Sequence, residues 1–209
     1  SSGDLAVCST GLIGELLPMD KIEAAVPQLF SQLGEAGGDA AAQAIMTTDT
    51  VPKQAAAARD GWSVGGMAKG AGMLAPQLAT MLVVLTTDAV VPAADLDAAL
   101  RAATRVSFDR LDSGGCMSTN DTVTVMASGA SGITPTPEDF TAALTQACTD
   151  LAMQLLKDAE GADHEIAITT LHAASEEEAV EVSRSVARSN LFKADRKSTR
   201  LNSSHGYIS

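Results

Sequence analysis

Thr80 stands at the end of a glycine-rich segment, where its hydroxyl could serve as a nucleophile. Residues 69–82 read KGAGMLAPQLATML, so a flexible glycine run and a proline precede this threonine. A threonine hydroxyl is a weak nucleophile near neutral pH unless a base lies beside it. If the chain were cut between Ala79 and Thr80, the new α-amine of Thr80, with an ordinary pKa of about 7.7–8.0, could act as that base. The segment therefore suits a residue that carries both nucleophile and base.

The same hydroxyl could also make the cut. Attack of the Thr80 side chain on the carbonyl carbon of Ala79 would give an ester, which water would then open. The small Ala79 and the glycines upstream would let the backbone approach that carbonyl closely. By residue type alone, however, Thr80 is more often an ordinary β-branched residue at the start of a strand.

Five stretches of the chain favour the chemical interpretation, because they resemble one family in the same order. Residues 69–82 match, at each fixed position, the cleavage signature of the ornithine acetyltransferase family, the bifunctional glutamate N-acetyltransferases of arginine biosynthesis. The other four stretches are CSTGLIG at 8–14, AIMTTDT at 44–50, STNDTV at 118–123 and DAEGA at 158–162. The resemblance extends from residue 4 to about residue 194.

The resemblance implies that Thr80 is the nucleophile and acetyl acceptor of a ping-pong transfer. N-acetylornithine would give its acetyl group to Thr80, ornithine would leave, and glutamate would take the group to become N-acetylglutamate. Thr10 and Gly11 match the oxyanion-hole pair of the family, and one such donor is typically worth about 3–4 kcal/mol of barrier. Some members also use acetyl-coenzyme A, which is a candidate co-substrate here; no bound cofactor and no metal are implied.

Three further residues match substrate contacts of the family. Lys69 would bind a substrate carboxylate, Thr47 would contact the substrate, and Glu160 would bind an ammonium group. The family favours DGEGAT around the glutamate, whereas Ala159 and Asp163 depart from that pattern here. Taken singly, a lysine of this kind is more often a solvated surface residue.

Two alternatives to an active acetyltransferase stay open. A related self-processing amidase or aminopeptidase would share the nucleophile but transfer the acyl group to water. The family also continues beyond residue 194 with a part that supplies further substrate contacts, so this chain could be an inactive fragment, truncated at both ends. We therefore expect weak or absent turnover from the chain as it stands, even if it is cut after Ala79.

Charge and composition restrict the partners. A formal charge of -12 argues against nucleic acid or anionic membranes as partners. The resemblance implies small amino-acid substrates, together with association of the two cleavage products in a heterotetramer or larger assembly. The alanine-rich composition favours a high-GC bacterium and hence the cytoplasm, whereas eukaryotic relatives lie in organelles. The three cysteines, too scattered for a disulfide framework or a zinc site, are Cys8, Cys116 and Cys148.

Strand-like and helix-like stretches interleave along the chain, which predicts an α/β layered fold. The predicted strands are 5–8, 81–85, 122–127 and 165–171. The first predicted helix begins at Asp20 and has a kink or break at Pro27. Further helices are predicted at 39–46, about 95–106, 137–157 and in the stretch after Ser175. Aromatic residues make up only 3% of the chain, so small residues are expected to bring helices and sheet close together. The resemblance implies a four-layer α/β/β/α sandwich in residues 1–134 and a partial α+β domain in 135–194, while 195–209 has the character of a non-native tail.

Overall fold

The computed structural model describes residues 6–11, 14–72, 81–113, 120–162 and 165–195. In chain order the elements within these residues are α1 (Met19–Ser31), α2 (Gly38–Ala44), β1 (Lys53–Arg59), β2 (Trp62–Lys69), β3 (Leu82–Thr87), α3 (Ala93–Val106), the 3-10 turn η1 (Phe108–Arg110), β4 (Thr122–Ala127), α4 (Pro137–Lys157), α5 (Glu176–Ala187) and α6 (Asn190–Asp195).

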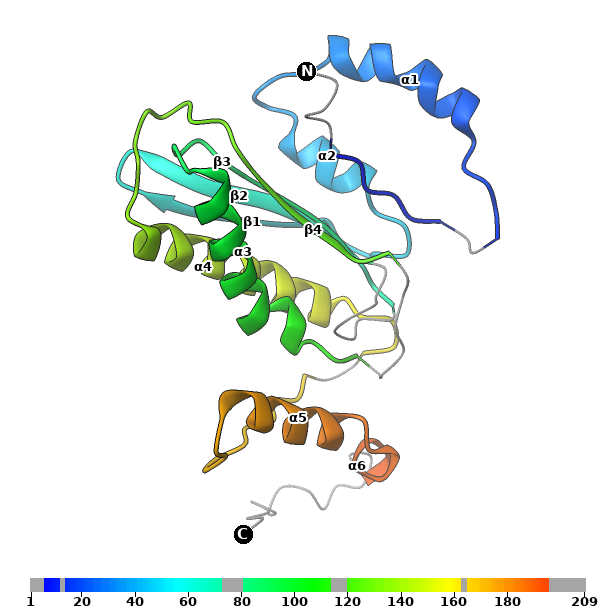
Figure 1. Cartoon of the computed structure of the whole chain (residues 1–209). Helices are drawn as coiled ribbons and strands as arrows, with labels where there is room; N and C mark the ends of the chain where they lie inside the picture. The colour runs from blue at the N-terminus through cyan, green and yellow to red at the C-terminus, as the bar shows by residue number, and fades with distance from the viewer. Residues whose placement is uncertain (1–5, 12–13, 73–80, 114–119, 163–164, 196–209) are drawn as a thin grey trace.

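A four-stranded sheet in the order β1-β2-β3-β4 forms the centre (Figure 1). The first three strands are antiparallel neighbours, and β3 and β4 are parallel. A parallel pair needs a long crossover connection, which here contains α3. The predicted α/β class is confirmed, as are the strands at 81–85 and 122–127. The described residues form this single sheet, so the four-layer arrangement stays a prediction.

The β1–β2 hairpin was not predicted, because its first strand reads KQAAAAR and alanine favours helix. Asp60 and Gly61 form a two-residue turn, with Gly61 at φ +79°, and Arg59 thereby pairs with Trp62. An Asp-Gly pair is a strong hairpin signal. The glycine-dense stretch then becomes part of β2, where Gly66 allows close approach to β3: a Cβ on it would lie 2.6 Å from the carbonyl oxygen of Val84.

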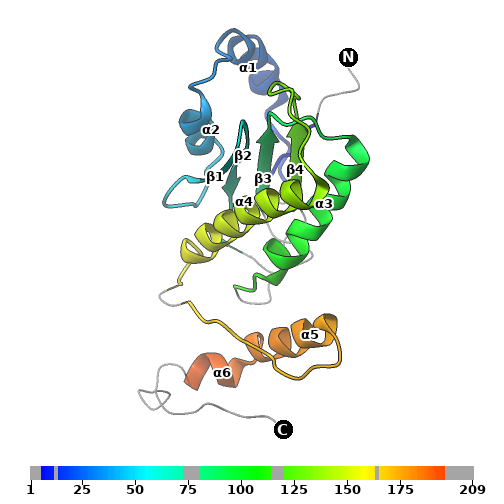
Figure 2. The same ribbon diagram turned by 90° about the vertical axis from the view of Figure 1, so that its left-hand side faces the viewer.

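The helices α3 and α4 cover one face of the sheet, and the hydrophobic core lies between these two helices and the sheet (Figures 1 and 2). Trp62 of β2 contacts Phe140 of α4, with ring centroids 6.0 Å apart. Much of the remaining core is alanine, as the scarcity of aromatic residues led us to expect: Ala57, Ala68, Ala99, Ala103, Ala143, Ala147 and Ala152 are all buried. Helix α4 begins as predicted, since the Thr136 hydroxyl accepts a 3.1 Å hydrogen bond from the Asp139 N–H.

Two predicted strands are wrong. Residues 6–8 and 165–171 have no regular structure, and Val7 and Leu171 are 80% and 69% exposed. An apolar run becomes a strand only when another strand pairs with it. Among the described residues no strand lies beside either run, so their hydrophobicity alone does not form sheet.

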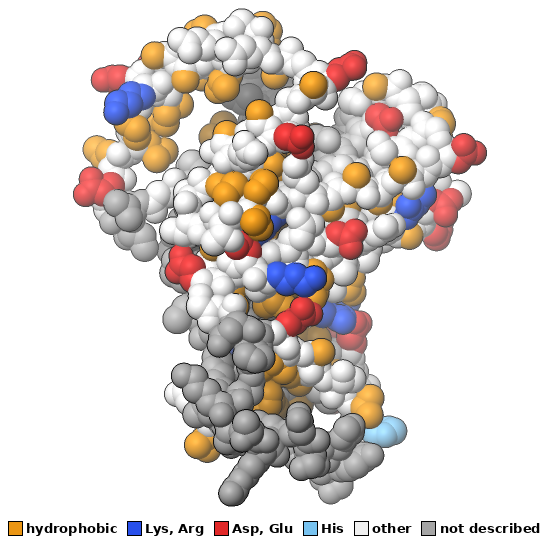
Figure 3. Space-filling model, turned by 180° about the vertical axis from the view of Figure 1, so that it is seen from behind, with side chains coloured by type: hydrophobic (Ala, Val, Ile, Leu, Met, Phe, Trp, Pro, Cys, Tyr) orange, Lys and Arg blue, Asp and Glu red, His pale blue; other side chains and the backbone are white. Residues whose placement is uncertain are grey.

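Helix α1 lies apart from the core. It is continuous through Pro27 rather than divided into two short helices, and it begins after Pro18, with Asp20 in its first turn. None of its residues is buried, and Leu29 and Phe30 are among the most exposed large hydrophobic side chains. In Figure 3 hydrophobic side chains gather along this arm at the upper left.

Helix α5 lies beyond the end of α3 (Figure 1). Its start is the predicted one: the Ser175 hydroxyl accepts a hydrogen bond from the Glu178 N–H, at 3.2 Å. Arg105 of α3 pairs with Glu176 and Glu177, but these side chains are half exposed, so the pairs contribute little stability. The division at residue 134 would place α4 in the second domain, whereas α4 packs on the central sheet. The division itself stays a prediction.

Candidate functional site

Both ends of the segment that carries Thr80 leave the sheet at the same edge. Lys69, the last residue of β2, pairs with Leu82, the first residue of β3. Ala79 and Thr80 themselves lie outside the described residues. The geometry of the site therefore comes from the residues that surround this edge.

Three segments far apart in sequence meet at the edge. The turn after α2 carries Thr47, whose N–H donates to Oδ2 of Asp49 at 3.2 Å. The end of β2 joins the same carboxylate, since the Gly70 N–H donates to Oδ1 of Asp49 at 2.7 Å. The turn after α4 is joined to that strand end through a hydrogen bond from the Glu160 N–H to the carbonyl oxygen of Ala71. The structure thus brings together the backbone segments of Thr47, Lys69 and Glu160.

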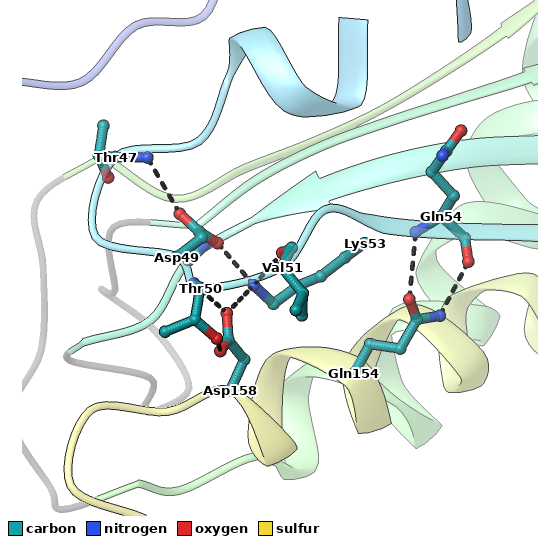
Figure 4. Close-up of polar contacts among 9 residues, drawn as sticks. Thr47, Asp49, Thr50, Val51, Lys53, Gln54, Gln154 and Asp158 are labelled. Atoms are coloured by element: carbon teal, nitrogen blue, oxygen red, sulfur yellow. Dashed lines mark hydrogen bonds and ion pairs between the residues drawn. The ribbon is translucent and has the colours of Figure 1, made fainter. Parts of the chain in front are cut away.

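A buried lysine completes the network (Figure 4). The side chain of Lys53 is fully buried, and its ammonium lies 2.7 Å from Oδ1 of Asp49 and 2.6 Å from Oδ2 of Asp158. Thr50 donates both its backbone N–H and its hydroxyl to the Asp158 carboxylate. Burying a charge is costly unless it is paired and hydrogen-bonded, and each charge here has several partners.

The two carboxylates stay ionised to lower pH than usual. Burial raises the pKa of Asp49, but hydrogen bonds from Gly70, Lys53 and Thr47 outweigh it, so the net pKa is lowered. Burial likewise raises the pKa of Asp158, and hydrogen bonds from Lys53 and Thr50 outweigh it. Both carboxylates of the network are therefore ionised at neutral pH.

Lys69 differs from Lys53 in its surroundings. It is only 2% exposed, yet it forms no ion pair in the part of the chain that the structure describes. Burial lowers the pKa of Lys69; Asp49 acts to raise it, and the positive charge of Lys53 acts to lower it. A buried ammonium without a paired anion is suited to receive one from a ligand.

Glu160 lies against the glycine-rich segment. A Cβ added to Gly72 would come within 3.2 Å of Oε2 of Glu160, so glycine leaves room for this carboxylate. Glu160 is exposed, which leaves its carboxylate accessible to a cationic group. The Ala159 that departs from the family pattern is buried and belongs to the core.

Asp121 fixes the residue that follows Thr80. Its Oδ1 accepts a 2.8 Å hydrogen bond from the Met81 N–H, and the Met81 carbonyl accepts one from the Thr122 N–H at 2.9 Å. Asp121 lies in a family-like stretch, but its residue type and position predicted no chemical step for it. The same is true of Asp49 and Asp158, which also lie within the family-like stretches. No chemical step was predicted for Lys53 either, which lies outside them.

Thr10 and Gly11 lie in a stretch without regular structure. Thr10 is half buried and Gly11 is exposed. Within the described residues no hydrogen bond joins either of them to Thr47, Lys69 or Glu160. Their role in an oxyanion hole stays a prediction.

Other nucleophiles and metal sites have little support in the described residues. Burial raises the pKa of the Cys148 thiol to about 12, so this cysteine stays protonated and packs as a small apolar residue. Cys8 is half buried, and Cys116 lies outside the described residues. Among the described residues, no group of three His, Cys, Asp or Glu side chains could hold a metal ion, and no helix is long and apolar enough to cross a membrane.

Comparison with known proteins identifies the family. The family model described as "ArgJ family" matches residues 1–199. The chain belongs to the ArgJ family. This confirms the resemblance that the five sequence stretches indicated.

Curated members of the family are similar over most of this chain. The protein named "Arginine biosynthesis bifunctional protein ArgJ" of Streptomyces coelicolor is 60% identical over 192 residues, which cover 92% of this chain and 50% of the relative. Proteins of the same name from Mycobacterium leprae and Thermobifida fusca are 60% and 58% identical over 193 residues. Those matches cover 91% and 92% of this chain, and 47% and 50% of the relatives. The chain thus spans about half the length of the curated relatives it matches.

Proposed function

We propose that this chain carries the Thr80 nucleophile and part of the substrate site of a bifunctional acetyltransferase of arginine biosynthesis. The reaction is transfer of the acetyl group of N-acetylornithine to glutamate through an acetyl-Thr80 intermediate. The observation that carries the proposal is the meeting of the Thr47, Lys69 and Glu160 segments at the sheet edge from which the Thr80 segment leaves. Membership of the ArgJ family supports it.

The nucleophile forms by scission of the chain. The Thr80 hydroxyl attacks the carbonyl carbon of Ala79, the peptide bond shifts to an ester, and water hydrolyses the ester to a carboxylate on Ala79. The freed α-amine of Thr80 then takes the proton of the hydroxyl as it attacks the acetyl group of the substrate. Thr10 and Gly11 stabilise the oxyanion in both steps, in keeping with the family pattern.

Substrate recognition follows from the charges at the edge. The buried ammonium of Lys69 binds the carboxylate that ornithine and glutamate share. The exposed carboxylate of Glu160 binds the side-chain ammonium of ornithine, and Thr47 makes a further contact with the substrate. A carboxylate at Lys69 would pair with a charge that has no ion pair in the described part of the chain, which favours amino-acid substrates over neutral amides.

Two further features belong to the proposal. The parts before and after the cut stay associated, because β2 and β3 on either side of it are neighbouring strands that share six residue pairs. They assemble into a heterotetramer or larger complex in the bacterial cytoplasm, with acetyl-coenzyme A as a candidate second donor.

The test is mass spectrometry of the purified 209-residue chain, with Thr80→Ala as the matched control. We expect the wild-type chain to separate into fragments that end at Ala79 and begin at Thr80, and the control to stay whole. After incubation with N-acetylornithine, the Thr80 peptide should carry one acetyl group, which glutamate removes as N-acetylglutamate. Release of acetate without N-acetylglutamate would favour the amidase alternative, and a chain that stays whole and unacetylated would refute the proposal.

Turnover by this chain is expected to be weak, since it spans about half the length of its relatives. Acetylation of Thr80 is therefore followed as a single turnover by mass. Fast multiple turnover by the 209-residue chain would show that the site is complete without further residues.

A further inference from the structure

We propose that Asp49, Lys53 and Asp158 are positioning residues, which hold the three substrate-contacting segments at the spacing that the ligand requires. The inference rests on the proposed function for the identity of the ligand. Its structural basis, the buried network of these three side chains, is independent of that function.

Asp49 sets the spacing between two of the segments. One carboxylate accepts hydrogen bonds from the Thr47 N–H at 3.2 Å and from the Gly70 N–H at 2.7 Å. The Asp49 side chain therefore binds the backbone of Thr47 itself and the backbone of Gly70, the residue directly after Lys69. A displacement of Asp49 moves the turn and the strand end relative to each other.

Lys53 and Asp158 attach the third segment. Asp158 is the C-cap residue directly after α4, and Glu160 follows two residues later. The Lys53 ammonium connects Asp158 to Asp49 with contacts of 2.6 and 2.7 Å, and Lys53 and Asp158 are 105 residues apart in sequence. The chain segments that carry Lys69 and Glu160 are thus attached to the two ends of one ionic network, through Gly70 and Asp158.

A contribution to stability does not by itself explain why Asp49, Lys53 and Asp158 form a buried ionic cluster. Well-packed apolar residues of similar volume often stabilise a protein as much as a buried ion pair does, or more. The three side chains lie beside the one sheet edge where the candidate site is, while the rest of the core is apolar and largely alanine, leucine and valine. Charged groups in this place provide directional contacts that fix backbone positions, which apolar packing does not.

The cluster also sets the charge around Lys69. The charged groups that act on Lys69 are Asp49, in the turn after α2, and Lys53 of β1. Asp49 raises the pKa of Lys69, and Lys53 lowers it. Removing one or the other should therefore move the ionisation of Lys69 in opposite directions, which general loosening of the fold would not do.

The first experiment measures that ionisation without any substrate. Competitive acetylation of the lysines with acetic anhydride at a series of pH values, read peptide by peptide in the mass spectrometer, gives the pKa of Lys69. We expect Asp49→Asn to lower this pKa and Lys53→Met to raise it, with Lys53→Arg close to wild type. Equal values in all four proteins, or a shift of the same sign for Asp49→Asn and Lys53→Met, would overturn the proposal.

The second experiment measures binding of N-acetylornithine by calorimetry to the Thr80→Ala form of the chain, so that no acetyl transfer occurs. Asp49→Asn, Lys53→Met and Asp158→Asn are each expected to raise the Kd by about ten- to a hundredfold, the effect expected of a misplaced site. Lys53→Arg, which keeps the cation, should recover the affinity to within about threefold of the parent protein.

Two controls separate positioning from stability. Leu151→Ala removes a fully buried side chain from α4, the helix directly before Asp158, and should lower the melting temperature but leave the Kd and the Lys69 titration unchanged. Asp97→Asn breaks an exposed ion pair with Arg101 and should change neither the Kd nor the Lys69 titration. If Leu151→Ala weakened binding as much as Asp158→Asn, the cluster would be only structural and the proposal would be overturned.

Failure of the proposed function gives a different result. If the parent chain binds no N-acetylornithine while the Lys69 pKa shifts in opposite directions, the network is upheld and the assigned ligand is wrong. If the ligand binds and the variants bind it equally well, the ligand is upheld and the positioning role is refuted.

Discussion

The Met81 N–H donates a 2.8 Å hydrogen bond to the carboxylate of Asp121. Met81 directly follows Thr80, so Asp121 holds the backbone on one side of the proposed cut. A hydrogen bond to a charged group is worth about 1.5–3 kcal/mol. Asp121 therefore holds the backbone directly after Thr80, next to the proposed cut.

We expect Asp121→Ala to slow the scission after Ala79 by about ten- to a hundredfold, which corresponds to about 1.4–2.7 kcal/mol. The rate is measured from the intact masses of freshly purified protein over time. Asp121→Asn keeps an oxygen acceptor, so its scission rate should lie between those of Asp121→Ala and wild type. An unchanged rate in Asp121→Ala would show that the backbone at Met81 is held without this carboxylate.

Two neighbouring glycines of β2 should respond differently to the same substitution. In Gly66→Ala the new Cβ would lie 2.6 Å from the carbonyl oxygen of Val84 and 2.8 Å from Cδ2 of Leu85, so β2 and β3 must separate. In Gly65→Ala the nearest atom is the Ala55 carbonyl oxygen, at 3.8 Å. We expect Gly66→Ala to lower the free energy of unfolding by about 1–3 kcal/mol and Gly65→Ala to change it little, as measured by urea titration. Equal stability of the two variants would contradict the register of β2 against β3.

A pair of phenylalanines tests where the core lies. Phe140 of α4 is 2% exposed, whereas Phe30 of α1 is 76% exposed. Phe140→Ala should destabilise the chain by about 3–5 kcal/mol, and Phe30→Ala by less than about 0.5 kcal/mol. Both are read from urea unfolding curves. A large loss in Phe30→Ala would mean that the α1 side chains are buried in solution.

Local signals predicted some elements well and missed others. Helix α4 was predicted because Thr136 and Pro137 form a strong start signal, and β4 because threonine and valine alternate along it. Strand β1 was missed because four successive alanines carry no strand pattern; they form a strand only because β2 pairs with them. Residues 165–171 failed for the opposite reason, since a strand-like pattern found no neighbour in the described residues.

The candidate site shows the same limit. Thr47, Lys69 and Glu160 could be selected one by one because each lies in a family-like stretch. One contact that connects their segments is made by Lys53, which lies outside those stretches and meets Asp158 across 105 residues. A single sequence contains no signal for such a contact, because nothing local to either residue depends on it.

Two buried lysines provide the last prediction. Lys53 is paired with Asp49 and Asp158, whereas Lys69 has no ion pair among the described residues. Lys53→Met leaves two buried carboxylates without their cation, so we expect a loss of about 3–5 kcal/mol in the free energy of unfolding at pH 7. Lys69→Met removes the charge of a largely buried side chain that has no ion pair among the described residues, so it should raise that free energy and abolish binding of N-acetylornithine.

The pH dependence fixes the sign of the Lys69 effect. Burial lowers the pKa of Lys69 below its ordinary value of 10.5, and the charge of Lys53 adds to this, although Asp49 opposes it. Between the lowered pKa and 10.5 the unfolded chain binds more protons at this residue than the folded chain does, so stability rises with pH in that window. The advantage of Lys69→Met over wild type should therefore be greatest near neutral pH and shrink as the pH rises, in urea titrations of the two proteins from pH 7 upward. A Lys69→Met protein less stable than wild type at pH 7 would show that the ammonium is paired in solution and would count against its role in binding a substrate carboxylate.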